Sequence, residues 1–479
     1  MTNLSGANLH NGAAVGPQGE GMESPSRFPK YPAYKDSGVE WLGVVPEHWV
    51  VTRLGRVTEI ESGYPFPAEQ FVDDGIPVVR MSDLKEGQVS LDSIKRVEAR
   101  FVPVKAMAKA DDLLIGLSGS ISNFAQVSAS DLPLAVNQRV GIIRADDSIE
   151  ATIAKYFVIS KSFICQIESA VPETTILNIS MEQVRSCALA WPPRFEQTQI
   201  ARFLDHETAR IDALIEEQQR LIELLKEKRQ AVISHAVTKG LDPTVPMKDS
   251  GVEWLGEVPA HWEVTRVGWQ CIVGNGCTPA RDNLDYWEDG HYPWLNSSKV
   301  NLDRVVEADQ FVTSQALKEC ALPIVKPGSV LMAITGEGKT RGMVTITEIE
   351  ATINQHVAFI EPRGSELLPT FLHDWLSANY SRLRHDSADW GSTKAAITCG
   401  DIRGYPLPLP PFDEQEEICQ FIDKKSWLID GLIASANENV DLLQERRSAL
   451  ISAAVTGKID VRGWRSATAK STQHQAVEA

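Results

Sequence analysis

The stretch KDSGVEWLG occupies residues 35–43, and the same nine residues return at positions 248–256. The likeness runs on, because VPEHWVVTRLG at 45–55 is matched by VPAHWEVTRVG at 258–268. Over residues 35–55 only positions 44, 47, 50 and 54 differ from their counterparts. A match of this length indicates a duplicated domain, not the short unit of a solenoid.

Further landmarks recur in the same order in both halves. Asn137-Gln138 is matched by Asn354-Gln355, and PPRFEQ at 192–197 is matched by PPFDEQ at 410–415. Each half therefore has the opening motif, a divergent stretch, a Pro-Pro pair and a long helix. A chain that keeps its framework while two equivalent stretches diverge suits one task performed on two different targets, although a scaffold could also diverge where it is least constrained.

The segments after the Pro-Pro pairs predict two long amphipathic helices. Their apolar residues recur at spacings of three, four and seven, with charged residues and Gln on the remaining face. Pro193 and Gly240 are suitable start and stop signals for the first helix. Roughly 40 residues at 1.5 Å each make a rod of about 60 Å. Two such rods pack most simply against each other, antiparallel; the alternative is that each helix only covers its own domain. The predicted seam is Ile200, Leu204, Ile211, Leu214, Ile215, Ile222, Leu225 and Val232, with Ile418, Ile422, Ile429, Leu432, Ile433, Val440, Leu443 and Leu450.

The divergent stretches predict α+β domains. Short β-like runs bounded by Gly, Pro, Asp and Ser alternate with helical segments near 153–168 and 369–384. The expected strands lie at 76–80, 112–115, 140–143, 329–334, 343–347 and 356–360. The expected fold class is therefore α+β, with two pseudo-repeated domains separated along the chain by two long helices that most simply form an antiparallel coiled coil. The expected organisation is a flexible tail at 1–33, domain 1 at 34–191, helix 1 at 192–241, domain 2 at 248–409, helix 2 at 410–461 and a flexible tail at 462–479.

Composition is ordinary for a soluble globular protein, with 43% hydrophobic and 23% charged residues among 479. No apolar run approaches the roughly 20 residues that cross a bilayer, and no secretory signal pattern opens the chain, which favours a cytoplasmic protein without membrane contact. Seven scattered cysteines without a CxxC pair argue against a disulfide framework and a zinc site. Cys271 and Cys277 are expected to be core thiols.

The formal net charge of −17 speaks against nucleic acid if it is taken alone, because phosphate binding relies on Lys and Arg. Net charge describes the whole surface, however, and not one face of it. Residues 80–109 carry more basic than acidic side chains. Charge therefore leaves DNA binding open.

Both halves contain KDSGVEWLGxVPxHW, a variable domain, the Pro-Pro motif and a long helix that ends in A(V/L)IS and AVT. This combination resembles the specificity subunit of type I restriction-modification systems. The resemblance covers residues 34–461. It implies two target recognition domains held apart by a coiled coil, each reading one half of a bipartite, asymmetric site in double-stranded DNA. It also implies partners, namely two modification subunits that methylate adenine and restriction subunits that translocate DNA. S-adenosylmethionine, ATP and magnesium are then expected on those partners, and this chain needs no cofactor of its own.

Two motifs resemble catalytic motifs, but the sequence around each of them argues against a catalytic role. AITGEGKT at 333–340 resembles a phosphate-binding loop, but a β-branched, alternating run follows where a helix should begin. A loop between strands, free to face DNA through residues such as Lys339 and Arg341, is the better interpretation. The Pro-Pro motifs lack the Asn that a base-flipping adenine methyltransferase needs, and proline is at home where a helix begins. We therefore expect no catalysis, and no metal site, in this chain.

Base reading should fall to loop residues whose side chains match base-edge donors and acceptors. For any single one of them, a solvated or phosphate-contacting role is favoured over base reading, and the Asn-Gln pairs are equally suited to cap a turn beneath the sheet. The two Trp pairs of the repeat, Trp41/Trp254 and Trp49/Trp262, should anchor each domain to its helix. A competing hypothesis is a non-enzymatic protein scaffold, whose binding would not fall steeply with salt as DNA binding does. The predicted DNA-binding residues are Tyr64, Arg80, Ser82, Ser118, Ser120, Asn123, Gln138 and Arg139 in the first domain, and Thr278, Asn296, Ser297, Lys299, Lys339, Arg341 and Lys394 in the second.

Overall fold

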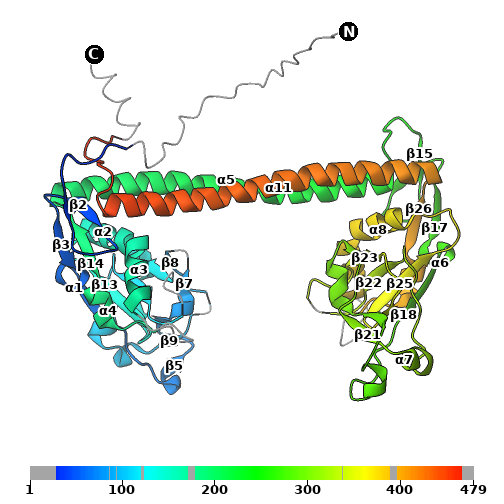
Figure 1. The fold of residues 1–479 in the computed structure, drawn as a ribbon, viewed down its shortest axis with the longest axis horizontal. Coiled ribbons are helices and arrows are strands. Elements are labelled where there is room, and N and C mark those ends of the chain that lie inside the picture. Colours follow the sequence, from blue (N-terminus) through cyan, green and yellow to red (C-terminus); the bar gives the residue numbers. More distant parts are fainter. Residues whose placement is uncertain are drawn as a thin grey trace, which may run out of the picture. The chain divides into compact units, whose positions relative to one another are not determined.

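The computed structural model describes residues 28–85, 87–92, 94–119, 123–170, 178–336, 338–388 and 396–465 (Figure 1). The chain divides into two compact units. Unit 1 comprises Met1–Gln218 together with Glu438–Ala479, and unit 2 comprises Gln219–Asn437. The long helices α5 (Arg194–Lys239) and α11 (Phe412–Val455) each contribute residues to both units.

Unit 1 is built around an antiparallel sheet in the order β11-β10-β13-β4. Side chains of β10 alternate between two cores: Leu113 and Ile115 pack with α2 and α3, whereas Leu114 packs with Val79 of β6 and Val136 of β12. Burial on both faces explains why these strands are continuous apolar runs in the sequence. The central elements are β4 (Glu59–Ser62), β10 (Leu113–Gly116), β11 (Phe124–Gln126), β13 (Val140–Arg144), α2 (Ser148–Val158), α3 (Lys161–Ala170) and α4 (Met181–Ser186).

A second sheet of unit 1 has the order β12-β6-β9-β5, with β12 parallel to β6. Its strands are β5 (Phe71–Val72), β6 (Ile76–Val79), β9 (Arg96–Val97) and β12 (Ala135–Val136). The remaining elements are β1 (Tyr34–Asp36), β2 (Val44–Pro46), β3 (Val50–Arg53), α1 (Leu54–Val57), β7 (Leu84–Lys85), β8 (Gln88–Val89) and β14 (Ala188–Trp191).

Unit 2 repeats this plan with one strand added at the sheet edge, in the order β18-β25-β22-β23-β20. A smaller sheet has the order β21-β19-β24, and its β19 and β24 are parallel, as β6 and β12 are. The strands of unit 2 are β15 (Met247–Asp249), β16 (Glu257–Pro259), β17 (Glu263–Arg266), β18 (Cys271–Asn275), β19 (Tyr292–Leu295), β20 (Arg304–Val305), β21 (Gln310–Val312), β22 (Val330–Ala333), β23 (Val344–Thr347), β24 (Thr352–Ile353), β25 (Val357–Pro362) and β26 (Pro406–Leu409). Its helices, besides its parts of α5 and α11, are α6 (Val267–Gln270), α7 (Ser314–Glu319), α8 (Pro369–Ala378), α9 (Tyr380–Ala388) and α10 (Cys399–Gly404).

The repeated motifs fasten the start of each long helix to its domain. In unit 1 the Glu196 carboxylate, whose side chain is 0% exposed, accepts hydrogen bonds from Trp49 Nε1 at 2.8 Å and His48 Nε2 at 2.6 Å. Gln197 Nε2 donates to the carbonyl of Pro192 at 3.0 Å. The VPxHW motif and the Pro-Pro motif are therefore two sides of one polar junction.

Unit 2 builds the same junction from the second copy. Glu414 accepts hydrogen bonds from Trp262 Nε1 at 3.0 Å and His261 Nε2 at 2.8 Å, and Gln415 Nε2 donates to the Pro410 carbonyl at 2.9 Å. Trp49 and Trp262 are fully buried, which confirms them as anchors. Trp41 is 38% exposed and Trp254 is only partly buried, so the same prediction is wrong for Trp41.

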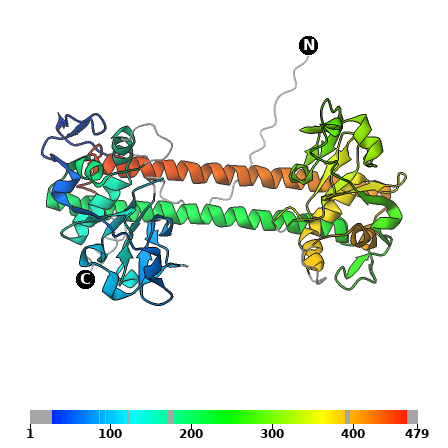
Figure 2. The same ribbon diagram turned by 90° about the horizontal axis from the view of Figure 1, so that it is seen from below.

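Within each unit the two long helices lie side by side and run in opposite directions (Figures 1 and 2). Ile211 of α5 and Leu450 of α11 share the core of unit 1. The ion pair between Arg447 Nε and Asp212 Oδ1, at 2.8 Å, crosses the helices in unit 1, and the pair between Arg229 Nη1 and Asp430 Oδ1, at 2.7 Å, crosses them in unit 2.

These two pairs correspond through the repeat, since Asp212 and Asp430 occupy equivalent positions, as do Arg229 and Arg447. Each helix thus supplies the acid in one unit and the base in the other. One predicted seam residue is misplaced: Leu432 is 56% exposed.

Four further expectations need correction. Residues 28–33 do not form a tail, because Tyr31 is 4% exposed and donates to Glu196 Oε2 at 2.9 Å. The end of the chain packs as far as Trp464, whose ring lies 5.4 Å from that of Phe203. Each predicted helix of the divergent stretches is split into two, α2 and α3 in unit 1 and α8 and α9 in unit 2. Cys277 is exposed and is not a core thiol.

Candidate nucleic-acid interface

The polar loops of each unit gather at one edge of its sheets. In unit 1, β4 and β10 both pair antiparallel with β13, so their carboxyl ends meet the beginning of β13. The chain continues from those ends into Tyr64 and Ser118, and it reaches β13 through Gln138 and Arg139. These residues lie between positions 64 and 139 of the sequence, and the sheet topology brings them together.

A tight turn before β13 presents two of these side chains. Asn137 Oδ1 accepts a hydrogen bond from Arg139 N at 3.3 Å, while Gln138 N donates to the Tyr64 carbonyl at 3.1 Å. The side chains of Gln138 and Arg139 are exposed. The Asn-Gln pair therefore has two roles, because Asn137 holds the turn and Gln138 faces outward.

The turn also requires a glycine beneath it. A Cβ atom on Gly63 would lie 2.3 Å from the carbonyl oxygen of Asn137, a distance that no side chain can accept. In unit 2 a Cβ atom on Gly276 would lie 1.7 Å from the carbonyl oxygen of Ile353. Both domains keep a glycine at this point for the same steric reason.

The other first-domain candidates surround this turn. Ser118 donates through Oγ to Met81 Sδ at 3.1 Å, which places it beside Arg80 and Ser82. Leu117, Ser118, Gln138, Arg139, Asn178 and Ile179 line a hollow of about 360 Å³. Asn123 lies at the same end of the β10–β11 hairpin, just before β11, where its carbonyl accepts from Gly116 N at 2.8 Å. The Arg80 guanidinium already has an internal partner, because its Nε lies 3.2 Å from Asp83 Oδ2.

In unit 2 the equivalent turn carries a hydrogen-bonded chain of side chains. Asn354 Oδ1 accepts from His356 N at 3.0 Å and so fixes the turn as Asn137 does. Thr278 donates through its hydroxyl to Gln355 Oε1. Gln355 Nε2 lies 3.1 Å from His356 Nε2, and Thr335 Oγ1 lies 2.8 Å from His356 Nδ1.

Of these four hydrogen-bonded residues, only Thr278 belongs to the predicted DNA-binding residues. Gln355 and His356 were not among the predicted residues, although the Asn-Gln landmark shared by the two halves was a usable signal for Gln355. Thr335 belongs to the loop at 333–340, which was expected to be free to face DNA.

Two second-domain candidates are not free to face DNA. Lys299 is 8% exposed, and its Nζ lies 2.8 Å from Asp309 Oδ1. Arg341 is 5% exposed. Both predictions took a basic residue in a polar stretch to be solvated, whereas the fold turns these two side chains inward.

The remaining candidates have mixed placements. Asn296 caps a short 3₁₀ helix by accepting from Ser298 N at 2.9 Å, and Ser297 is half-buried next to it. Lys339 is exposed, with its carbonyl accepting from the Tyr380 hydroxyl at 2.5 Å. Ser120 and Lys394 lie outside the described residues.

The loop that resembles a phosphate-binding motif joins β22 to β23, which pair antiparallel. Arg384 Nη1 donates to the Gly338 carbonyl at 2.7 Å and to the Arg341 carbonyl at 3.1 Å. Lys339 and Thr340, where a phosphate-binding helix would begin, therefore lie in a loop that leads into β23, and the interpretation as a loop between strands is confirmed.

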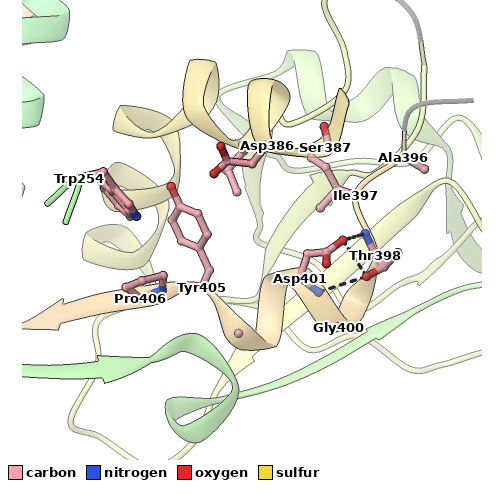
Figure 3. A pocket seen from close by; sticks show the side chains of 12 residues that line it. Trp254, Asp386, Ser387, Ala396, Ile397, Thr398, Gly400, Asp401, Tyr405 and Pro406 are labelled. Atoms are coloured by element: carbon pink, nitrogen blue, oxygen red, sulfur yellow. Dashed lines mark hydrogen bonds between the residues drawn. The ribbon is translucent and has the colours of Figure 1, made fainter. Parts of the chain in front are cut away.

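A larger hollow of about 600 Å³ lies elsewhere in unit 2, next to Trp254, Ile397 and Tyr405 (Figure 3). Its carboxylates are already engaged: Asp401 Oδ2 accepts from Thr398 N at 2.7 Å, and Asp386 lies 3.1 Å from Arg382 Nε. Neither lysine nor arginine is among the described residues that line it. An apolar, acidic lining is unsuited to the phosphate backbone, so this hollow is separate from the candidate interface.

Buried thiols offer no nucleophile in either domain. Burial raises the pKa of the Cys187, Cys271 and Cys419 thiols to about 12. They stay protonated near neutral pH, and the thiolate is the reactive form of cysteine.

Two copies of one α+β domain, each with the same turn but with different side chains on it, define a protein built to recognise two targets. The chain belongs to the family described as the type I restriction modification DNA specificity domain, whose model matches residues 46–225 and 259–434. It thus carries two DNA specificity domains in tandem.

Relatives and solved structures agree with this assignment. The chain is 22% identical over 441 residues to the type I restriction enzyme EcoBI specificity subunit of Escherichia coli, a match that covers 90% of each chain. It is 22% identical to the EcoKI specificity subunit of E. coli K12, covering 88% of this chain and 91% of the relative.

The fold is similar to a structure solved for the assembly and conformational transition of a type I R-M system, with a TM-score of 0.65, 18% identity and coverage of 86% and 98%. It is also similar to the HsdS subunit of Thermoanaerobacter tengcongensis, with a TM-score of 0.50, 19% identity and coverage of 87% and 98%.

Among the described residues, no helix is long and apolar enough to span a membrane.

Proposed function

We propose that this chain is the DNA specificity subunit of a type I restriction-modification complex. It binds a bipartite, asymmetric site in double-stranded DNA and directs adenine methylation and restriction by partner subunits, without catalysis of its own. The observation that carries the proposal is the matched turn at Asn137 and Asn354, which presents Gln138-Arg139 in one domain and Gln355-His356 in the other. The same position with different side chains is what reading two different half-sites requires.

The helix pair sets the spacing of the two half-sites in this proposal. An antiparallel coiled coil of α5 and α11 would separate the domains by a fixed length and leave the DNA between the half-sites unread. The equivalent ion pairs Asp212–Arg447 and Asp430–Arg229 support an antiparallel register at both ends of the helices. Half-site spacing in other DNA readers is likewise fixed by protein geometry.

Exposed apolar residues on the two helices provide the docking surface for modification subunits. Trp427 is 75% exposed, Leu432 and Leu442 are each 56% exposed, and Leu224 is 51% exposed. The repeat offers its framework twice, which suits two modification subunits, with restriction subunits joining the assembly. These partners would hold S-adenosylmethionine, ATP and magnesium.

The competing hypothesis of a protein-binding scaffold is not favoured, because both divergent domains match a DNA specificity family. The strongly acidic net charge is compatible with DNA binding when the basic and amide side chains gather on one edge.

The test is to co-express the chain with its cognate modification subunit and to map methylated adenines in the host DNA. Methylation at one bipartite motif, absent when this chain is omitted, is the expected result. Replacing residues 56–190 with the corresponding domain of another specificity subunit should then change one half of the motif only. Methylation that persists without this chain, or a stable complex that never methylates, would overturn the proposal.

A further inference from the structure

The two equivalent turns differ at their third residue, which is Arg139 in the first domain and His356 in the second. Their backbones are held alike. Asn137 N donates to the Val79 carbonyl at 2.9 Å, and Asn354 N donates to the Leu295 carbonyl at 3.0 Å. The third residue's carbonyl also accepts in both turns, from Leu117 N at 3.0 Å and from Ile334 N at 2.9 Å. A fixed backbone with a variable side chain is how a rigid scaffold presents a selective contact.

We propose that this third residue of the Asn-Gln-Xaa turn determines one base of each half-site, and that Arg139 selects a guanine in the half read by the first domain. The inference rests on the proposed function, since it assigns a residue of the same interface. Arginine is suited to this role because its planar fork donates two hydrogen bonds to O6 and N7 of guanine in the major groove.

Arg139 is available where neighbouring arginines are not. Its side chain is exposed, and it makes no hydrogen bond or ion pair with any other residue that the structure describes. By contrast, Arg80 pairs with Asp83, Arg144 binds Asp112 at 2.6 Å, and Arg185 donates to the carbonyl of Ile60 at 2.5 Å. Taking one of these to a base would first break an internal contact, whereas Arg139 gives up only water.

His356 makes a different contact in the second domain. Because Gln355 donates its amide N–H to Nε2, the neutral ring carries its proton on Nδ1 and donates it to Thr335 Oγ1. A ring held on both nitrogens cannot offer the two parallel donors of a guanidinium. The half read by the second domain should therefore not select guanine through this position, and His356→Arg should introduce that selection.

The experiment uses the complex with the modification subunit and maps methylated motifs for wild type, Arg139→Ala, Arg139→Lys and His356→Arg. Arg139→Ala should relax one guanine position in the first-domain half, with discrimination at that position falling roughly 5- to 150-fold. Arg139→Lys, which keeps the charge but loses the planar fork, should also lose discrimination there. His356→Arg should create a guanine preference at one position of the other half only.

Arg53→Gln is the matched control, since Arg53 is an exposed arginine of the same domain on β3, away from the turn. It should leave the motif unchanged. Unaltered motifs in the Arg139 variants, or changes spread over both halves, would overturn this inference while leaving the proposed function intact. Absence of any motif with the wild-type chain would instead defeat the proposed function. Methylation at the untouched half-site in each variant shows that the chain is folded.

Discussion

Replacing Glu196 with alanine should destabilise unit 1 more than the matching Glu414→Ala change destabilises unit 2. The Glu196 carboxylate is completely buried and accepts three hydrogen bonds, from Tyr31, His48 and Trp49. Glu414 is 25% exposed and accepts two, from His261 and Trp262. The two junctions are therefore natural controls for each other.

The expected size follows from the groups that lose their acceptor. Each buried donor left without a partner costs about 1–3 kcal/mol, and Tyr31 and Trp49 are both buried. Water reaches His48, whose side chain is 42% exposed, so it adds little. Relief from burying a carboxylate offsets part of the loss, which leaves a destabilisation of about 3–5 kcal/mol for Glu196→Ala. For Glu414→Ala, where water replaces part of the contact, about 1–2 kcal/mol is expected.

Urea denaturation of the full chain, followed by tryptophan fluorescence, measures the total effect. Hydrogen exchange of the amides at the start of α5 and of α11 assigns it to one junction. Glu196→Gln, which keeps one acceptor oxygen, should lose less than Glu196→Ala. The reasoning is refuted if Glu414→Ala costs as much as Glu196→Ala, or if Glu196→Ala costs under about 1 kcal/mol, since the carboxylate would then not hold the junction together.

Three other predictions test separate features. Burial raises the pKa of the Asp374 carboxyl above its ordinary value of 3.8. Its contribution to the stability of unit 2 is therefore greatest below pH 3.8 and is lost as the pH rises through the higher pKa of the folded state. In thermal melts, Asp374→Asn should be more stable than the wild type at pH 8 but not at pH 4. Exchanging the charges of Asp212 and Arg447 together should recover most of what each single reversal loses, with a coupling of about 0.2–1 kcal/mol in a double-mutant cycle because both groups are partly exposed; an additive cycle would show that the pair does not contribute. DNA affinity of the complex should fall linearly with the logarithm of salt concentration, by roughly 10³–10⁵ between 50 and 200 mM for 6–10 phosphate contacts, and a flat titration would count against DNA as the ligand.

The framework could be predicted from the sequence because its signals are local and written twice. Heptad spacing and the Pro-Pro pair predict the long helices, and the structure places both directly after those prolines. The predicted strands appear because their apolar runs are buried on both faces of the sheet. What failed depended on tertiary contacts: Tyr31 was assigned to a tail because nothing in the N-terminal sequence shows that Glu196 needs a third donor.

The site could be predicted only in part, for a related reason. Residue type and a polar neighbourhood select candidates, but burial depends on partners that lie far away in the sequence. Lys299 is the clearest case, since it occupies the position of Asp83 in the first domain, and each is buried against a charge supplied by its own domain. His356 was overlooked because its role depends on Thr335, a residue from a different strand end.

The division of labour within each copy explains how one fold reads different sequences. The residues that fasten domain to helix, Glu196 with Trp49 and Glu414 with Trp262, are identical in the two halves, and they lie at the junction with the helix rather than on the Asn-Gln-Xaa turn. The turn depends on its asparagine and the glycine beneath it, so neither constraint involves the exposed third side chain. If that side chain reads a base, as proposed above, a change at that position costs the fold little while altering what the domain binds. Duplication of the domain, followed by divergence at such positions, would then give two domains that bind different sequences on the same framework.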